Sequence, residues 1–149
     1  MTRLNLLDPV ALTNRHLVAE YKELTQIIYP MKRAALNGIN NTEIPENFTL
    51  NKGHVKFFYN KGLYLYNRFI SLKDEMVERG IHIDIEGFQN RLRKISESFP
   101  EEWYNDWNPS IDDYKIIIYR IAKRIIQKPE SYPDKNRFFL FVENMQGIQ

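Results

Sequence analysis

The chain has 149 residues and a mass of 17.9 kDa, a length that suits one compact domain better than two. Hydrophobic residues make up 43% and charged residues 27%, which excludes a chain that is disordered throughout. The absence of cysteine excludes disulfide scaffolds, thiolate metal sites and cysteine nucleophiles, while a formal net charge of +2 indicates no partner by itself.

The N-terminal part of the chain predicts a long helix. Asp8-Pro9 and Thr13 both offer helix starts, because Asp and Thr cap helices and Pro is tolerated in the first turn. The apolar stripe that follows, at spacings of four, three and four residues, consists of Leu17, Tyr21, Leu24 and Ile28. Pro30 should kink or interrupt this helix, residues 31–36 can continue it, and Asn37-Gly38 should end it.

Two further helices are predicted in the middle of the chain, after a loop at residues 38–53 that contains Asn, Pro and Gly. The first runs from about Lys61 to Arg79 and stops at Gly80. Its apolar stripe consists of Leu65, Phe69, Leu72 and Met76. The second is shorter and ends before Pro100. Its stripe consists of Ile85, Phe88, Leu92, Ile95 and Phe99.

The C-terminal part predicts one more helix. Residues 100–109 are rich in Trp, Tyr, Asn and Pro and indicate a packed loop, after which Ser110 and Asp113 match a capping box with Asp in place of Glu. An isoleucine-rich helical stripe follows and ends before Pro129, whereas the apolar run at residues 138–142 predicts no particular conformation. The expected fold is all-α: a single compact domain, residues 1–149, of three or four helices with long loops.

The chain contains no signal for a membrane or for export. No apolar run reaches the roughly 18 residues that a transmembrane helix requires, and the N-terminus lacks the apolar core and cleavage site of a signal peptide. We therefore expect no membrane partner and a cytoplasmic protein, either nucleoid-associated or in a phage-infected host cell.

Conventional catalytic signatures are absent from the sequence. His16, His54 and His82 are too far apart to form a spaced metal motif, and we interpret each as an ordinary surface or core histidine. There is no glycine-rich phosphate loop and no serine nucleophile elbow. We therefore expect no metal site and no cofactor.

Basic charge is concentrated between Lys115 and Lys128, a stretch with five Lys or Arg residues and no Asp or Glu. Arg120 and Arg124 are four residues apart, so they share one helix face, with the isoleucine stripe on the other side. Guanidinium groups suit bidentate contacts to phosphate. A solvated helix face gives the same pattern, so the pattern alone allows both interpretations.

Acidic side chains lie on one side of the predicted N-terminal helix. His16, Glu20 and Glu23 follow one another at spacings of four and three residues, which places them along a single face. A carboxylate in this position is either catalytic or merely exposed and solvated, and the spacing does not distinguish the two.

Three separated blocks of the sequence resemble the pyrimidine dimer DNA glycosylases of the phage endonuclease V type. These blocks are Met1–Leu6 (MTRLNL), His16–Leu24 (HLVAEYKEL) and Gly53–Tyr59 (GHVKFFY). The similarity has no gaps up to about residue 38, resumes at residues 53–80 and is weaker over residues 110–129. Three blocks in the correct order are more specific than any single short motif.

The resemblance implies a bifunctional DNA N-glycosylase and abasic-site (AP) lyase that acts as a monomer on cyclobutane pyrimidine dimers in damaged duplex DNA. In the family Met1 is removed, and the α-amine of Thr2 attacks C1′ of the damaged nucleotide; the resulting iminium is resolved by β-elimination. An α-amine has a reference pKa near 7.7–8.0, against about 10.4 for lysine, so it is the more available nucleophile. Glu23 matches the catalytic carboxylate.

The resemblance also implies a set of DNA contacts, in a family that kinks the duplex and flips a base out of the stack. The implied positions are Arg3, Lys22, Gln26, Lys32, Arg33, Arg120 and Arg124. The family usually has arginine where this chain has Lys22 and Gln26. Lys22 keeps the charge but loses the planar fork, and Gln26 loses the charge.

Departures from the family pattern leave other functions open. After Pro129 the aromatic run of the family is replaced by Glu130–Asp134 (ESYPD) and a longer hydrophobic tail, and residues 84–109 are also different. One alternative is the same amine chemistry on abasic sites or another modified base. Others are a DNA-binding protein that has lost catalysis, which would not need Thr2 and Glu23 together, and a helical structural protein.

Overall fold

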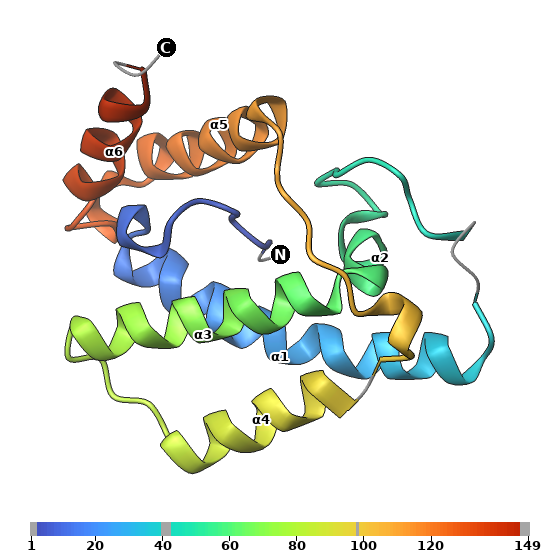
Figure 1. The fold of residues 1–149 in the computed structure, drawn as a ribbon. Helices are drawn as coiled ribbons and strands as arrows, with labels where there is room; N and C mark the ends of the chain where they lie inside the picture. Colours follow the sequence, from blue (N-terminus) through green and yellow to red (C-terminus); the bar gives the residue numbers. More distant parts are fainter. Residues whose placement is uncertain (1–2, 40–42, 98, 147–149) are drawn as a thin grey trace.

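The structure is a computed structural model, in which residues 3–39, 43–97 and 99–146 are described. The described residues form six α-helices and no strand (Figure 1). The helices are α1 (Asn14–Leu36), α2 (His54–Phe57), α3 (Gly62–Glu78), α4 (Ile85–Glu97), α5 (Ile111–Gln127) and α6 (Asn136–Gln146). The predicted all-α fold is confirmed. The helix count exceeds three or four because α2 is a single turn of four residues and α6 covers the apolar run that predicted no conformation.

Local capping and apolar periodicity explain where α1 begins and which face it buries. The Thr13 hydroxyl accepts the backbone N–H of His16 at 3.2 Å, as an N-cap residue does. All four residues of the predicted stripe are buried. Pro30 does not interrupt the helix, which continues to Leu36. Its missing N–H leaves one carbonyl unpaired, but Ile28 and Met31 on either side are buried in the core, so packing holds the helix together.

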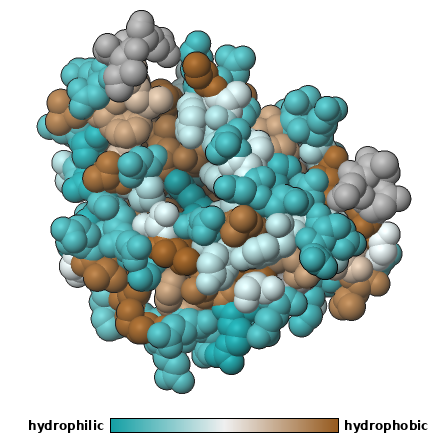
Figure 2. All heavy atoms as spheres, in the orientation of Figure 1, coloured by the Kyte–Doolittle hydropathy of each residue, from teal (hydrophilic) through white to brown (hydrophobic). Residues whose placement is uncertain are grey.

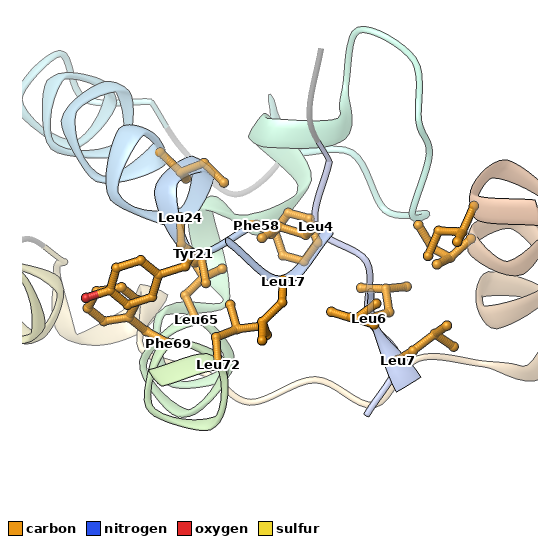
Figure 3. Close-up of a cluster of buried hydrophobic side chains, with 14 of the residues drawn as sticks. Leu4, Leu6, Leu7, Leu17, Tyr21, Leu24, Phe58, Leu65, Phe69 and Leu72 are labelled. Carbon is orange, nitrogen blue, oxygen red and sulfur yellow. The ribbon is translucent and has the colours of Figure 1, made fainter. Parts of the chain in front are cut away.

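The core lies where α1 packs on α3 and α3 packs on α4. Tyr21 of α1 stacks on Phe69 of α3, with ring centroids 4.9 Å apart (Figure 3), and Phe69 contacts Phe88 of α4 at 5.0 Å. The predicted stripe of α3 is entirely buried. Helix α3 ends at Glu78, and Gly80, two residues later, has a φ of +74°, a left-handed conformation that glycine adopts without strain.

Helix α5 begins with the predicted capping box. Ser110 Oγ accepts the backbone N–H of Asp113 at 3.1 Å, and Asp113 Oδ2 accepts the backbone N–H of Ser110 at 2.9 Å. Every fourth residue from Ile117 is buried, so Ile117, Ile121 and Ile125 face the core. Of the basic residues between them, Lys123 and Arg124 are exposed, as the sequence predicted, whereas Arg120 is half-buried.

The N-terminal segment, residues 3–7, is not helical and passes between α5 and the α1–α3 pair (Figure 1). Leu4, Leu6 and Leu7 are buried and point into the same apolar cluster as the helices (Figure 3). Burial of three leucines is worth several kcal/mol, which holds this segment against the helices. The outer surface mixes hydrophilic and hydrophobic residues (Figure 2). Within the described chain, no helix combines the length and hydrophobicity needed to cross a membrane.

Candidate functional site

A buried histidine holds the N-terminal segment by its backbone. The N–H of Leu4 donates to Nε2 of His54 at 3.0 Å, and Nδ1 of His54 donates to the carbonyl of Thr49 at 2.9 Å. Both ring nitrogens are therefore used, and Nε2 must be the unprotonated acceptor. Burial lowers the pKa of His54 to about 4, with the hydrogen bond to Thr49 opposing that shift. His54 is thus neutral at pH 7, in the form that accepts the Leu4 N–H.

A buried ion pair holds the next residue. Glu20 of α1 is 0% exposed and Arg68 of α3 is 7% exposed. Arg68 Nε donates to Glu20 Oε2 at 2.6 Å and Nη2 donates to Oε1 at 3.0 Å, a bidentate geometry. The backbone N–H of Asn5 donates to the same Oε1 at 3.0 Å. Three donors therefore satisfy a carboxylate that burial would otherwise penalise strongly.

The same arginine supports a strained turn in the segment. Leu6 has a φ of +58°, a left-handed conformation that is costly for a residue with a β-carbon. The N–H of Leu7 donates to the carbonyl of Asn5 at 2.5 Å across this turn. Arg68 Nη1 donates to the carbonyls of Leu6 and Leu7 at 3.3 and 2.6 Å. Contacts from α1, α3 and the residues around His54 thus fix the path of the chain directly after Arg3.

Glu23 lies three residues beyond Glu20 on α1, so it is on nearly the same face of the helix. Its side chain is half-buried, and this burial raises the pKa of Glu23 above its usual range, with the Arg3 guanidinium opposing the shift. Glu23 lines a groove of about 560 Å³ on α1 together with Lys22 and Gln26. The groove is open to solvent and contains this acidic residue beside a basic one.

Arg3 links the segment to the basic helix. Its Nε donates to the carbonyl of Leu50 at 3.1 Å. It belongs to the segment that passes between α5 and the α1–α3 pair (Figure 1), and its charge lowers the pKa of both Glu23 and Arg120. Burial lowers the pKa of Arg120 first, and Arg124 and then Arg3 lower it further. Arg3, Arg120 and Arg124 therefore form one region of positive charge beside Glu23.

The segment Glu130–Asp134, which departs from the family pattern, lies beside the positive region. His16 stacks on Tyr132, with ring centroids 4.9 Å apart, and Asp134 Oδ2 accepts the backbone N–H of Asn14 at 2.8 Å. Burial lowers the pKa of His16 to about 4, and Arg120 and Arg124 lower it further. The replaced run is therefore an ordered part of the surroundings of the site, joined to the first turn of α1.

The remaining predicted site residues lie either far from Glu23 or outside the described residues. Lys32 and Arg33 are nine and ten residues beyond Glu23 on α1, about 14 Å along a helix axis. Lys32 lines a different pocket, near Trp103, and the Arg33 guanidinium lies 5.9 Å from the ring of Tyr29. Thr2, the predicted nucleophile, lies outside the described residues. In the part of the chain that is described, no three His, Asp or Glu side chains form a group able to hold a metal ion.

Sequence reasoning missed the residues that hold the segment. Glu20 was expected to be catalytic or solvated, and the structure corrects this, because the carboxylate is fully buried and bonded to Arg68 and Asn5. His54 was interpreted as an ordinary histidine, and nothing in the spacing connects it to Leu4. Both residues belong to the blocks that resemble the family, which was the only available signal.

Comparison with protein families identifies a match over the N-terminal part of the chain. The family described as pyrimidine dimer DNA glycosylase matches residues 1–87, which is more than half of the 149 residues. The match includes the N-terminal segment, α1, α2 and α3, and therefore Arg3, Glu20, Glu23, His54 and Arg68. Helix α5 and the C-terminal run lie beyond it. The chain belongs to the pyrimidine dimer DNA glycosylase family, and it is by that membership a DNA glycosylase.

Proposed function

We propose that this protein excises cyclobutane pyrimidine dimers from duplex DNA and then cuts the strand as an AP lyase, with the α-amine of Thr2 as nucleophile and Glu23 as the catalytic carboxylate. The observation that carries the proposal is the position of Arg3. This residue directly follows Thr2 in the chain, its Nε donates to the carbonyl of Leu50 in the groove that also contains Arg120, and its charge lowers the pKa of both Glu23 and Arg120.

The contacts around residues 3–7 support a fixed position for the start of the chain. The backbone N–H groups of Leu4 and Asn5 donate to His54 and Glu20, and Arg68 donates to the turn that follows. A nucleophile held in place gains reactivity, because less motion has to be frozen to reach the attacking geometry. This set of contacts is what a catalytic N-terminal amine requires, since an unanchored terminus would be mobile.

The proposed reaction conserves protons and electrons at each step. The unprotonated Thr2 amine attacks C1′, the bond from C1′ to the base breaks, and the base leaves with that electron pair and takes up a proton. The attached nitrogen loses a proton, and its lone pair then forms the iminium with C1′ as the bond from C1′ to the ring oxygen breaks; the ring oxygen keeps that electron pair and takes up a proton. Removal of a proton from C2′ expels the 3′ phosphate by β-elimination, and hydrolysis of the iminium releases Thr2.

Glu23 can serve both parts of this sequence. As a carboxylate it stabilises the positive charge that builds on the sugar as the base departs. Burial raises its pKa, and a carboxyl group with a raised pKa exchanges protons more readily near neutral pH. We assign it the removal and return of protons during elimination.

The positive region made by Arg3, Arg120 and Arg124 is the proposed DNA-binding surface next to the reacting sugar. Arginine binds phosphate in bidentate fashion, and each neutralised phosphate makes the affinity depend on salt. Lys22 and Gln26, in the groove with Glu23, are proposed to contact the damaged strand. Lys32 and Arg33 lie far enough along α1 that we propose contacts to more distant phosphates.

A different substrate is the second candidate, and two observations favour it. Gln26 puts a neutral side chain in the groove with Glu23, and Tyr132 and Asp134 of the replaced run pack beside His16 and Asn14. These residues would change which lesion fits while leaving the amine chemistry intact. Abasic sites or another modified base are the alternative targets.

The decisive experiment is borohydride trapping on three matched duplexes that carry a single thymine dimer, an abasic site or no damage. The protein must have its native N-terminus, and mass spectrometry identifies the trapped residue. We expect a dimer-dependent adduct on Thr2. An adduct with the abasic duplex alone would assign the lyase and reject the dimer as substrate, and binding without any adduct would assign a DNA-binding protein that has lost catalysis.

An N-terminally blocked preparation is the matched control for the nucleophile. Acetylation or a retained tag removes the free amine, while the anchored residues from Arg3 onward are unchanged. We expect such a protein to bind damaged duplex but to form no adduct and make no cut. Full cutting by the blocked protein would show that Thr2 is not the nucleophile.

A further inference from the structure

A groove along α5 extends from Arg120 and Arg124, which the proposed reaction uses, to Lys115 and Tyr119, which it does not. Its volume is about 690 Å³, and we call it the α5 groove. The residues that matter for its chemistry are Lys115, Ile116, Tyr119, Arg120, Lys123 and Arg124. Four of these six carry positive charge, and no acidic residue lines the groove.

Tyr119 is the unusual member of this set. Its side chain is 70% exposed, and it lies on the same helix turn as Arg120, with Lys115 and Lys123 four residues before and after it. An exposed tyrosine by itself is ordinary. An exposed aromatic ring beside several cations, in a groove whose described lining includes no acidic residue, is a combination that binds unpaired nucleic acid, because bases stack on rings and cations neutralise phosphates.

We propose that the α5 groove binds an unpaired nucleobase, which stacks on the ring of Tyr119 while Arg120, Lys123 and Arg124 hold the phosphates on either side of it. The inference rests on the proposed function for the choice of DNA as ligand. It goes beyond that function by assigning base contact, and not only phosphate contact, to α5. Helix α5 also lies outside the residues that the family match covers.

Charge complementarity selects the occupant of the groove. Side chains four residues apart on a helix are about 6 Å apart, which is close to the spacing of successive phosphates along an extended strand. The bases of such a strand need an apolar surface between the phosphate contacts, and Tyr119 with Ile116 provides one. An acidic protein segment would use the cations but would leave the ring without a stacking partner.

The test separates base stacking from phosphate contact by using a strand that has no bases. Binding is measured by fluorescence anisotropy for a short oligothymidylate and for a tetrahydrofuran phosphate strand of the same length. The wild-type protein should bind oligothymidylate about tenfold more tightly, within the range for one stacked base. Y119F should keep this preference, and Y119A should abolish it. The matched control is I126A, since Ile126 is 71% exposed on the same helix but outside the groove.

Several results would overturn the inference. Equal affinity of the wild-type protein for the two strands would show that α5 contacts phosphates only. A preference for oligothymidylate that survives in Y119A would show that Tyr119 does not bind the base. Displacement of oligothymidylate by an acidic peptide at equal concentration would indicate a protein partner instead. Far-UV circular dichroism of Y119A confirms folding, and the truncation of an exposed ring should leave the spectrum unchanged.

Parallel trapping on an abasic duplex keeps this inference distinct from the proposed function. An adduct on Thr2 without any base preference would retain the enzyme and reject the stacking role of Tyr119. A Tyr119-dependent base preference without an adduct would retain the groove as a nucleic-acid site and reject the amine chemistry.

Discussion

The buried neutral His54 makes the stability of this protein depend on pH, in a direction that the structure determines. Its pKa is about 4 in the folded protein and close to 6.5 when the chain is unfolded. As the pH falls below 6.5, His54 becomes protonated in the unfolded chain but stays neutral in the folded protein. The free energy of unfolding therefore decreases until the pH reaches about 4. Protonation in the folded state would also break the hydrogen bond from Leu4 to Nε2.

The size of the effect follows from the two pKa values. One pKa unit corresponds to about 1.4 kcal/mol, so the whole difference amounts to about 3 kcal/mol. Between pH 7 and pH 5 the unfolded histidine becomes almost fully protonated while the folded one does not. The loss in this interval is therefore about 2 kcal/mol from His54.

Urea denaturation at pH 7 and pH 5 measures this loss directly. We compare the wild-type protein with H54Q, which cannot titrate, and with H82N as the control, because His82 is exposed. H54Q should lose about 2 kcal/mol less than the wild-type protein between the two pH values, whereas H82N should match the wild-type protein. His16 and the carboxylates are present in all three proteins and cancel in the comparison.

The reasoning would be refuted by an equal loss of stability in H54Q and the wild-type protein. A second readout does not require the variant to fold well. Nuclear magnetic resonance of the imidazole of His54 should show no titration between pH 7 and pH 5, because the folded pKa lies near 4. A midpoint near 6.5 would contradict the acceptor role of Nε2.

Three further predictions concern the active site and its supports. E23Q should fold as the wild-type protein does, because Glu23 is only half-buried, and should lose on the order of 100-fold or more in trapping rate; full glycosylase activity in E23Q would remove Glu23 from the mechanism. R68M should lower the free energy of unfolding by about 3–5 kcal/mol in urea titrations, because it leaves the buried Glu20 carboxylate without its partner; a loss below about 1 kcal/mol would mean that the ion pair is not buried in solution. The double variant R120A/R124A should reduce the slope of log affinity for duplex DNA against log salt concentration by about 2; an unchanged slope would place the phosphates elsewhere.

The helices could be predicted because the signals that determine them are local. Thr13 and Ser110 cap α1 and α5 through hydrogen bonds to residues three positions later, and such spacings can be read directly from a sequence. The buried stripes of α1 and α3 follow from a period of three and four residues. The effect of Pro30 could not be predicted in the same way, because the outcome depends on how tightly the residues beside it are packed.

The contacts that build the site could not be predicted from the spacing of residues in the sequence. The partners of Glu20 and Leu4 are 48 and 50 residues away in the chain, so no period or motif connects them. The sequence could indicate that Glu23 and the arginines of α5 matter, through resemblance and charge. It could not indicate that Glu20, three residues before Glu23, stabilises the fold as a buried partner of Arg68.

The sequence by itself determined the helical class, the caps, the buried stripes and the resemblance that leads to the family, since each depends on neighbours in the chain or on whole blocks of residues. Only the tertiary structure decided the different surroundings of the two carboxylates on α1. Glu20 is enclosed between helices, where a charge must be paired with Arg68, while Glu23 lies at the surface of a groove beside Arg3. The physical reason is that burial and pairing depend on which distant segments come to lie against a side chain.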